Sequence, residues 1–278
     1  MVTQTKRLNY QEIHQFQCFI LGYFKIYGRM FPWRETVDPY SILVSELMLQ
    51  QTQTFRVVPK YIAFLKQFPS LEKLAQASLS EVLNLWQGLG YNRRALYLIK
   101  LSQEVIQNYN GVLPKSVKAL EKLPGIGPYT AAAVAAFAFN QPEILIETNI
   151  RTVFFYHFFS GKEKVNDMSL QPLIKQTLYM ENPRIWYWAL MDYGAMLKRE
   201  IGNFNLQSKH YSKQSSFEGS NRQIRGQIIK NLLTKKIVSK NQLVKIIDRD
   251  KKTLMQLIQQ MEKEELIHIN GDKIGLKN

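Results

Sequence analysis

Apolar residues recur every three to four positions along most of the chain, with short polar interruptions between the repeats. That spacing is typical of amphipathic helices, whereas the two-residue alternation that marks strands is almost absent before residue 260. The pattern therefore predicts an all-α body. Its helices are expected at 11–27, 39–53, 57–67, 70–77, 79–86, 93–109, 116–122, 130–139, 149–158, 169–180 and 183–197.

The pattern changes after this body. A polar, serine-rich segment over 204–220 is expected to be a connector. Beyond it, residues 221–278 predict three helices and then a hairpin around Asn270-Gly271, which is the pattern of a small winged-helix (α+β) domain. These helices are expected at 223–234, 239–247 and 250–263, and the strands at 266–269 and 273–276.

Charge narrows the choice of partner. The 278 residues carry a formal net charge of +15, which favours a polyanion, and nucleic acid over a membrane surface. Residues 221–278 hold 13 Lys and Arg against 6 Asp and Glu, so the winged helix is expected to bind DNA through its third helix. A winged helix that binds protein is the alternative.

Other classes are excluded by composition. No apolar run approaches the roughly 20 residues that span a bilayer. The single cysteine, Cys18, excludes an internal disulfide and a four-cysteine metal site, and its apolar neighbours predict a buried thiol. The four histidines are scattered without ligand spacing, which argues against a metal-dependent hydrolase. We expect a cytoplasmic protein.

The turn at 123–130, Leu-Pro-Gly-Ile-Gly-Pro-Tyr-Thr, lies between two predicted helices. Glycine tolerates left-handed backbone, so Gly125 and Gly127 favour a tight turn that exposes N–H groups beside a helix N-terminus. Such a turn can bind one phosphate. The helix after it is followed by a short apolar run that ends on Glu147. A plain helix–helix turn with a surface glutamate is the alternative.

The helix predicted at 39–53, with Asp38 as its N-cap, carries polar residues in an unusual setting. Glu46 and Gln50 share a face, yet the neighbours of Glu46 at the positions four and three before it and three after it, Ile42, Leu43 and Leu49, are apolar. Desolvation raises the pKa of a carboxyl group, so Glu46 suits a general acid. Gln50 and Gln51 offer uncharged donors and acceptors for base edges. A stripe of polar residues facing water is the alternative.

Two carboxyl groups in different surroundings suit the cleavage of a glycosidic bond. Glu46 would protonate the leaving group, and ionised Glu147 would stabilise the developing sugar cation or attack it. A base in a duplex must first leave its stack, and an inserted side chain can hold the duplex open. Tyr91, directly after Gly90, is a candidate for that wedge, with an ordinary core tyrosine as the alternative.

Segments spread in order over residues 31–198 resemble the helix-hairpin-helix DNA glycosylases, and most closely the adenine DNA glycosylases of the MutY type. The resemblance implies a two-lobed glycosylase body, with lobes at 1–30 plus 141–203 and at 31–140. The matching segments are Phe31-Pro32-Trp33-Arg34, Asp38-Pro39-Tyr40, 45–53, Leu85-Trp86, 88–91, 123–130, Glu147 with Asn149, and 191–195.

The resemblance also implies roles. Glu46 matches the acid that protonates adenine, and Glu147 matches the catalytic carboxylate. Arg34 and Asp192 match positions near the base pocket. Residues expected at the DNA are Gln50, Gln51, Tyr91, Leu123, Gly125, Gly127 and Thr130. Tyr129 stands where lyase-active relatives carry a Schiff-base lysine, which implies a monofunctional enzyme that leaves an abasic site.

Three departures from the family stand out. The family usually has Asp where this chain has Glu147, and one methylene more moves a carboxylate by about 1.5 Å. Most relatives bind an iron–sulfur cluster, but Lys198 stands at its first cysteine position and the others are missing, so no cofactor is expected. The basic connector residues Lys209, His210 and Lys213 are expected to face DNA. The winged helix replaces the family's Nudix-like domain.

The expected function is the removal of adenine opposite 8-oxoguanine or guanine in duplex DNA by a monomer. A glycosylase for mismatched thymine or uracil is the nearest alternative. A DNA-binding protein that has lost its chemistry is another, supported by the departure at Glu147.

Overall fold

Side chains that accept hydrogen bonds from the first turn set the start of many helices in the computed structural model, which describes residues 7–161, 164–209, 211–214 and 216–277. Asn9, Ser78 and Ser239 each form a reciprocal capping box with the residue three positions on. Asp38 accepts the N–H of Ser41 at 2.8 Å, which confirms it as the predicted cap.

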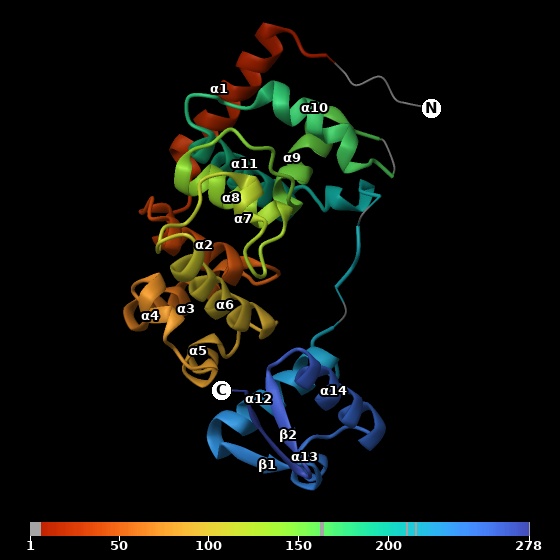
Figure 1. The fold of residues 1–278 in the computed structure, drawn as a ribbon. Coiled ribbons are helices and arrows are strands. Elements are labelled where there is room, and N and C mark those ends of the chain that lie inside the picture. The colour runs from red at the N-terminus through yellow and green to blue at the C-terminus, as the bar shows by residue number, and fades with distance from the viewer. Residues whose placement is uncertain (1–6, 162–163, 210, 215, 278) are drawn as a thin grey trace. The chain divides into compact units, whose positions relative to one another are not determined.

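The described body of the chain is helical, as predicted (Figure 1). Its elements are α1 (Tyr10–Tyr27), η1 (Pro32–Arg34), α2 (Pro39–Leu49), α3 (Thr54–Gln67), α4 (Leu71–Ala75), α5 (Leu79–Trp86), α6 (Arg93–Asn108), α7 (Val117–Leu120), α8 (Pro128–Phe139), α9 (Thr148–Phe158), α10 (Asp167–Thr177), α11 (Pro183–Glu200) and η2 (Phe204–Gln207).

The C-terminal residues add the one small sheet of the described chain. Their order is α12 (Asn221–Lys235), β1 (Ile237–Ser239), α13 (Lys240–Ile246), α14 (Lys251–Lys263), β2 (Ile267–Asn270) and β3 (Lys273–Leu276). The strands pair antiparallel in the order β1-β3-β2, with Ile237 opposite Gly275 and Ile269 opposite Ile274. The two-residue turn of the hairpin is Gly271-Asp272, one position later than expected, with Gly271 at φ 60°.

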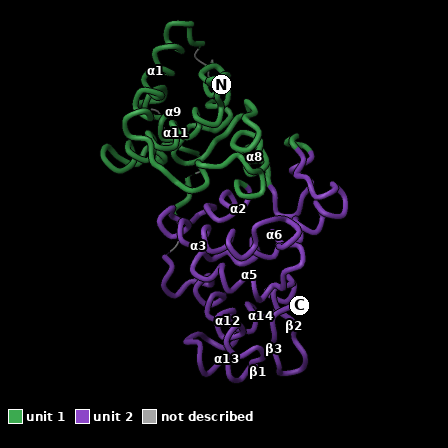
Figure 2. The backbone as a smooth tube through the Cα atoms, turned by 90° about the vertical axis from the view of Figure 1, so that its left-hand side faces the viewer, with its two compact units in different colours: residues 1–42, 115–118, 127–213 green, residues 43–114, 119–126, 214–278 purple. Residues whose placement is uncertain are grey.

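The chain forms two compact units (Figure 2). Unit 1 contains residues 1–42, 115–118 and 127–213, and unit 2 contains 43–114, 119–126 and 214–278. The chain therefore passes between the units several times, once within α2 and again beside Gly127. The lobe boundaries expected from the resemblance stay a prediction.

Each unit has its own apolar core. In unit 1, α1, α9 and α11 bury Ile20, Phe154 and Trp186 completely. In unit 2, Phe64 of α3 and Trp86 of α5 are completely buried and their ring centroids lie 6.0 Å apart. No helix among the described residues is long and apolar enough to cross a membrane.

Three further local expectations were wrong. Helix α2 ends at Leu49 rather than residue 53, because Gln51 adopts a left-handed backbone with φ 53°. Strand β1 was missed, because three residues are too few to show a two-residue alternation. Cys18 of α1 is exposed rather than buried, with its Sγ 3.7 Å from His14 Nε2.

Helices α9 and α11 approach each other closely at Gly194. A Cβ atom placed there would lie 2.1 Å from the carbonyl oxygen of Asn149, which is far inside van der Waals contact. Glycine is required at this crossing by the neighbouring backbone rather than by its own dihedral angles.

Replacing Gly194 by alanine should lower the free energy of unfolding by about 1–3 kcal/mol, because the backbone of α9 or α11 must shift. Gly22→Ala in α1 is the matched control, since a Cβ there meets nothing within 4 Å. That control should be neutral or stabilising by up to about 1 kcal/mol. Urea unfolding measures both, and equal stability of the two variants would contradict the packing argument.

Candidate functional site

A buried arginine from α6 holds the C-terminal end of α2, where Gln50 lies. Arg94 Nη1 donates to the carbonyl oxygens of Met48 at 3.2 Å and Gln50 at 2.8 Å, and also to that of Leu47. Carbonyls at a helix end lack intrahelical partners, and the helix dipole favours a cation there. Burial lowers the pKa of Arg94 to about 10, so the guanidinium stays charged at neutral pH.

The same guanidinium holds the tight turn before Tyr91. Arg94 Nη2 donates to the carbonyl oxygens of Leu89 at 3.2 Å and Gly90 at 3.1 Å. Trp86 Nε1 also donates to the Gly90 carbonyl oxygen, at 3.1 Å. One arginine thus fixes both the end of α2 and the turn that presents Tyr91.

Gln51 and Tyr91 both adopt left-handed backbone, with φ angles of 53° and 48°. This conformation costs an L-residue on the order of 1–2 kcal/mol, and such strain gathers where a protein holds a ligand. The Tyr91 hydroxyl donates to Gln51 Oε1, so the structure brings two predicted DNA contacts together. Tyr91 is 37% exposed, which argues against an ordinary core tyrosine.

Glu46 is half-buried on α2, and the side chains three and four positions before it, Leu43 and Ile42, are fully buried. This confirms the apolar setting of the helix on which the acid was predicted. Its role as a proton donor stays a prediction.

The hairpin at 123–127 is anchored by buried Leu123 and Ile126. Ile126 donates its N–H to the Leu123 carbonyl at 3.2 Å, which closes the turn. Gly125 has φ 78°, and a Cβ there would lie 2.6 Å from the Tyr97 Cβ, so two constraints require glycine. Gly127 instead has an extended backbone and caps α8.

The side chains of this hairpin region differ in their access to solvent. Leu123 and Thr130 are buried, so a phosphate could meet only their backbone. Tyr129 is half-buried in the first turn of α8. The 12-residue α8 presents its N-terminus directly after the turn, which is the arrangement the sequence predicted for a phosphate contact.

Glu147 is the N-cap of α9 as well as the candidate catalytic carboxylate. Its Oε1 accepts the N–H groups of Asn149 and Ile150, each at 2.8 Å. Burial raises the pKa of Glu147, and these two hydrogen bonds together with the nearby Arg151 and Lys198 only partly offset that effect. The longer side chain is thus accommodated by folding back onto the first turn of its own helix.

Arg34 and Asp192 form a buried ion pair in unit 1. Arg34 Nη1 and Nη2 lie 2.8 and 2.9 Å from the two carboxylate oxygens, and the Arg29 side chain and backbone N–H also bind Asp192. Burial alone would raise the pKa of Asp192, but the bonds from the two arginines outweigh it and hold the pKa below its usual value. The pair fixes η1 to α11.

The segment after α11, where the resemblance led us to look for cluster cysteines, is closed by hydrogen bonds. Asn205 in η2 is buried and donates to the Thr148 carbonyl at 3.1 Å and the Thr152 hydroxyl at 2.7 Å. Val165 donates its N–H to the Gln207 carbonyl at 2.8 Å. A four-thiolate cluster does not fit residues of this kind. Of the connector's expected basic residues, His210 lies outside the described residues.

The site residues predicted from the sequence divide between the units. Gln50, Gln51 and Tyr91 come together in unit 2, where Glu46 also lies. Arg34, Asp192, Tyr129 and Glu147 belong to unit 1. The approach of Glu46 to Glu147, which the chemistry requires, stays a prediction.

Arg94 is the residue that sequence reasoning missed. The signal was a charged residue on the apolar face of its helix, because positions 94, 98, 101 and 105 follow helical spacing and are all buried. A buried arginine in such a row needs fixed hydrogen-bond acceptors.

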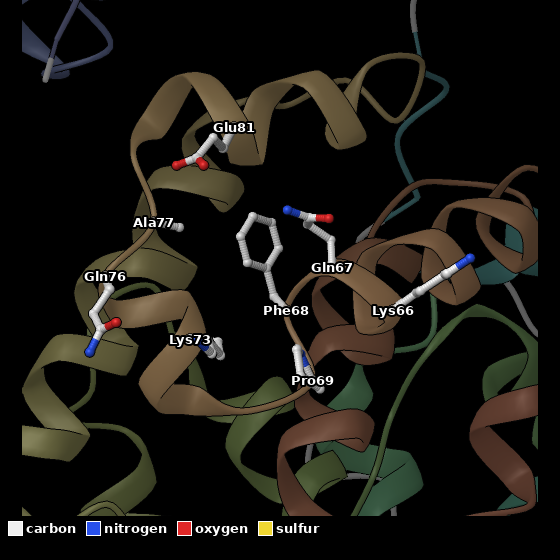
Figure 3. Close-up of a pocket in the computed structure, with 8 residues that line it drawn as sticks. All are labelled: Lys66, Gln67, Phe68, Pro69, Lys73, Gln76, Ala77 and Glu81. Carbon is white, nitrogen blue, oxygen red and sulfur yellow. The ribbon is translucent and has the colours of Figure 1, made fainter.

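Unit 2 also has a hollow of about 350 Å³ that contains none of the predicted site residues. It lies beyond the end of α3, with Phe68 at its centre and the Lys66 side chain extending away from it (Figure 3). Glu81 at its edge is occupied in the capping box of α5. Nothing in this arrangement points to a ligand.

Comparison with known proteins gives a consistent picture. Residues 44–175 match the HhH-GPD superfamily of base excision DNA repair proteins. The adenine DNA glycosylase of Buchnera aphidicola subsp. Baizongia pistaciae is 36% identical over 183 residues, 64% of this chain and 51% of that protein. That of Mycobacterium tuberculosis (strain H37Rv) is 41% identical over 135 residues, 48% of this chain and 44% of that protein.

The chain therefore spans about half the length of the curated relatives it matches. A solved structure described as a thermostable thymine-DNA glycosylase has a TM-score of 0.62 and 29% identity, and covers 72% of this chain and 97% of that chain. The predicted resemblance to helix-hairpin-helix DNA glycosylases is confirmed.

Arg94→Lys should lower the free energy of unfolding by about 2–3 kcal/mol, because one ammonium group cannot bind carbonyls of both α2 and the turn. Arg199→Lys is the control, since that side chain is 73% exposed and its pair with Glu200 contributes little. Chemical denaturation measures both variants. If the two variants are equally stable, the paired N–H groups of the Arg94 guanidinium are not needed to hold α2 and the turn.

Asp192→Asn should cost about 3–5 kcal/mol at neutral pH, because it leaves Arg34 buried beside a neutral group. The folded-state pKa of Asp192 is lowered, so its stabilisation is complete above the unfolded pKa of about 3.9 and is lost as pH falls through the folded pKa. The difference in the free energy of unfolding between wild type and variant should therefore shrink below about pH 4. Urea unfolding across this range checks it, with exposed Asp248→Asn as control.

Proposed function

We propose that this chain, which carries a domain of the HhH-GPD superfamily of base excision DNA repair proteins, is a monofunctional DNA glycosylase that removes adenine paired with 8-oxoguanine or guanine. The observation that carries the proposal is the 36% identity, over 64% of the chain, to a protein named adenine DNA glycosylase. The net charge of +15 supports duplex DNA as the partner.

The proposed reaction breaks the bond between the sugar C1′ and N9 of adenine after the nucleotide leaves its stack. Glu46 donates a proton to the adenine ring, so that the base departs as a neutral molecule. Ionised Glu147 stabilises the positive charge that develops on the sugar. A water oxygen then bonds to C1′, the water proton passes to the Glu46 carboxylate that the first step left ionised, and an abasic site remains.

Tyr129 supports hydrolysis without strand cleavage. A lyase needs an amine to form a Schiff base with the opened sugar. The phenol of Tyr129 cannot form one, so we infer that the abasic strand stays intact. The proposed chemistry uses the chain's own carboxyl groups and no cofactor.

We infer that residues 221–278 are a winged helix that adds to DNA binding. The order of three helices and a hairpin, the additional strand β1 and the sheet order β1-β3-β2 support this assignment. Its excess of basic residues suits the phosphate backbone. The protein would act as a monomer on nucleoid DNA in the cytoplasm.

A glycosylase for thymine mispaired with guanine is the second candidate. It is favoured by the 29% identity to the structure described as a thymine-DNA glycosylase, which covers 72% of this chain. Labelled duplexes with A:8-oxoguanine, A:G, T:G and U:G pairs, treated with hot alkali after incubation, separate the candidates. Release from T:G alone would replace adenine with thymine in the proposal, and release from none would leave a non-catalytic DNA-binding protein.

Glu147→Gln should reduce the single-turnover rate on A:8-oxoguanine by about 10²–10⁴-fold and leave duplex binding unchanged. An amide oxygen can still cap α9, so folding is preserved. In the wild type the rate should rise with pH through the pKa of Glu147, which lies above its usual value because of burial. A variant as fast as wild type, or a variant that keeps the wild-type rise of the rate with pH, would remove Glu147 from the mechanism.

A further inference from the structure

A groove of about 590 Å³ lies within unit 2, on the side of the Tyr91 turn that faces the C-terminal residues. One wall is formed by Tyr91 and Tyr97 of the turn and α6. The other is formed by Arg222 and Arg225 of α12, with Gln260 of α14. Ligand sites typically have volumes of about 300–1,000 Å³, so the groove is large enough for one nucleotide.

The C-terminal residues contact the candidate wedge directly. Arg222 Nη1 donates to the Tyr91 hydroxyl at 3.1 Å, and Gln214 Nε2 donates to it at 2.9 Å. The guanidinium carbon of Arg222 lies 5.8 Å from the centre of the Tyr91 ring, and that of Arg94 lies 5.4 Å from it. Residues more than 120 positions apart therefore share one aromatic side chain.

The charges of the groove are unequal. Its lining includes Arg93, Arg94, Arg222 and Arg225 but a single acid, Glu264. Glu264 is bound by Arg225 and lies 4.0 Å from Arg93, so it balances part of this charge. The excess is positive, and it surrounds aromatic rings.

These side-chain types match the parts of a nucleotide. A guanidinium binds phosphate through paired N–H groups. A tyrosine face stacks on any base, and such stacking contributes about 1–3 kcal/mol per base. Gln50, Gln51 and Gln260 offer amides to base edges. An apolar peptide or a lipid chain carries no anion to balance the positive excess of the groove lining.

We propose that this groove holds one nucleotide of the DNA whose base has left the stack, with Arg222 of α12 as the second wall of the site. The inference rests on the proposed action on DNA. The nucleotide comes either from the strand that carries the excised base or from the opposite strand, and the experiment separates the two.

The first test compares the affinity of the full chain for a duplex with one unpaired thymine and for the same duplex fully paired, by fluorescence anisotropy. Arg222→Gln should reduce the preference for the unpaired thymine by about tenfold or more, which is about 1.4 kcal/mol. Lys230→Gln removes the same charge from the exposed side of α12, outside the groove, and should weaken both duplexes equally. Thermal unfolding checks that both variants fold.

The second test places 5-iodouracil in an A:G mismatch duplex, next to the adenine in one sample and in the opposite strand in the other. After irradiation, mass spectrometry should find the crosslink at Tyr91 or Tyr97, and the reactive sample identifies the strand. Crosslinks to neither tyrosine, or equal loss of preference in Arg222→Gln and Lys230→Gln, would overturn the proposal.

Base release distinguishes this proposal from the proposed function. If the wild type prefers the unpaired thymine and crosslinks at the groove but releases no base, the proposal about the groove holds and the proposed glycosylase activity is wrong. If the wild type releases adenine and Arg222→Gln keeps its full preference for the unpaired thymine, the proposed glycosylase activity holds and the proposal about the groove is wrong.

Discussion

The arrangement of unit 2 depends on the hydrogen bonds of one buried guanidinium. Arg94 collects carbonyl oxygens from the last turn of α2 and from the turn at 88–90, two segments about 40 residues apart in sequence. Because a buried cation needs fixed acceptors, both segments must adopt the backbone that presents those oxygens. The left-handed conformations of Gln51 and Tyr91 follow directly after these segments. Their strain is tolerable because the neighbouring carbonyls are bound.

In unit 1, a buried carboxylate and a hydrogen-bonded segment link parts of the chain that are distant in sequence. Asp192 on α11 holds Arg29 and Arg34, which ties the chain between α1 and α2 to the helix that crosses α9 at Gly194. At the start of the same helix α9, Asn205 binds Thr148 and Thr152. Buried amide and hydroxyl groups therefore link the segment after α11 to α9.

Much of the fold could be predicted because its signals are local. Helix α5 was predicted to the residue, since Ser78 and Glu81 form a capping box and Gly88 follows soon after the last turn. The end of α2 could not be predicted, because it is decided by Arg94, which is distant in sequence. The contact of Arg222 with Tyr91 likewise depends on how α12 packs within unit 2, and no spacing along the chain encodes it.

From the sequence, the residue types of the candidate site could be predicted better than their geometry. Glu147 shows why. From the sequence, one additional methylene appeared to displace the carboxylate, but the longer side chain bends back so that one oxygen accepts two backbone N–H groups of α9. Those bonds favour the ionised form, whereas burial favours the neutral form, and burial prevails in raising the pKa. A carboxylate in this balance is held in position and only weakly stabilised as an anion. In the reaction that we propose, such a carboxylate would gain most as positive charge develops on the sugar beside it.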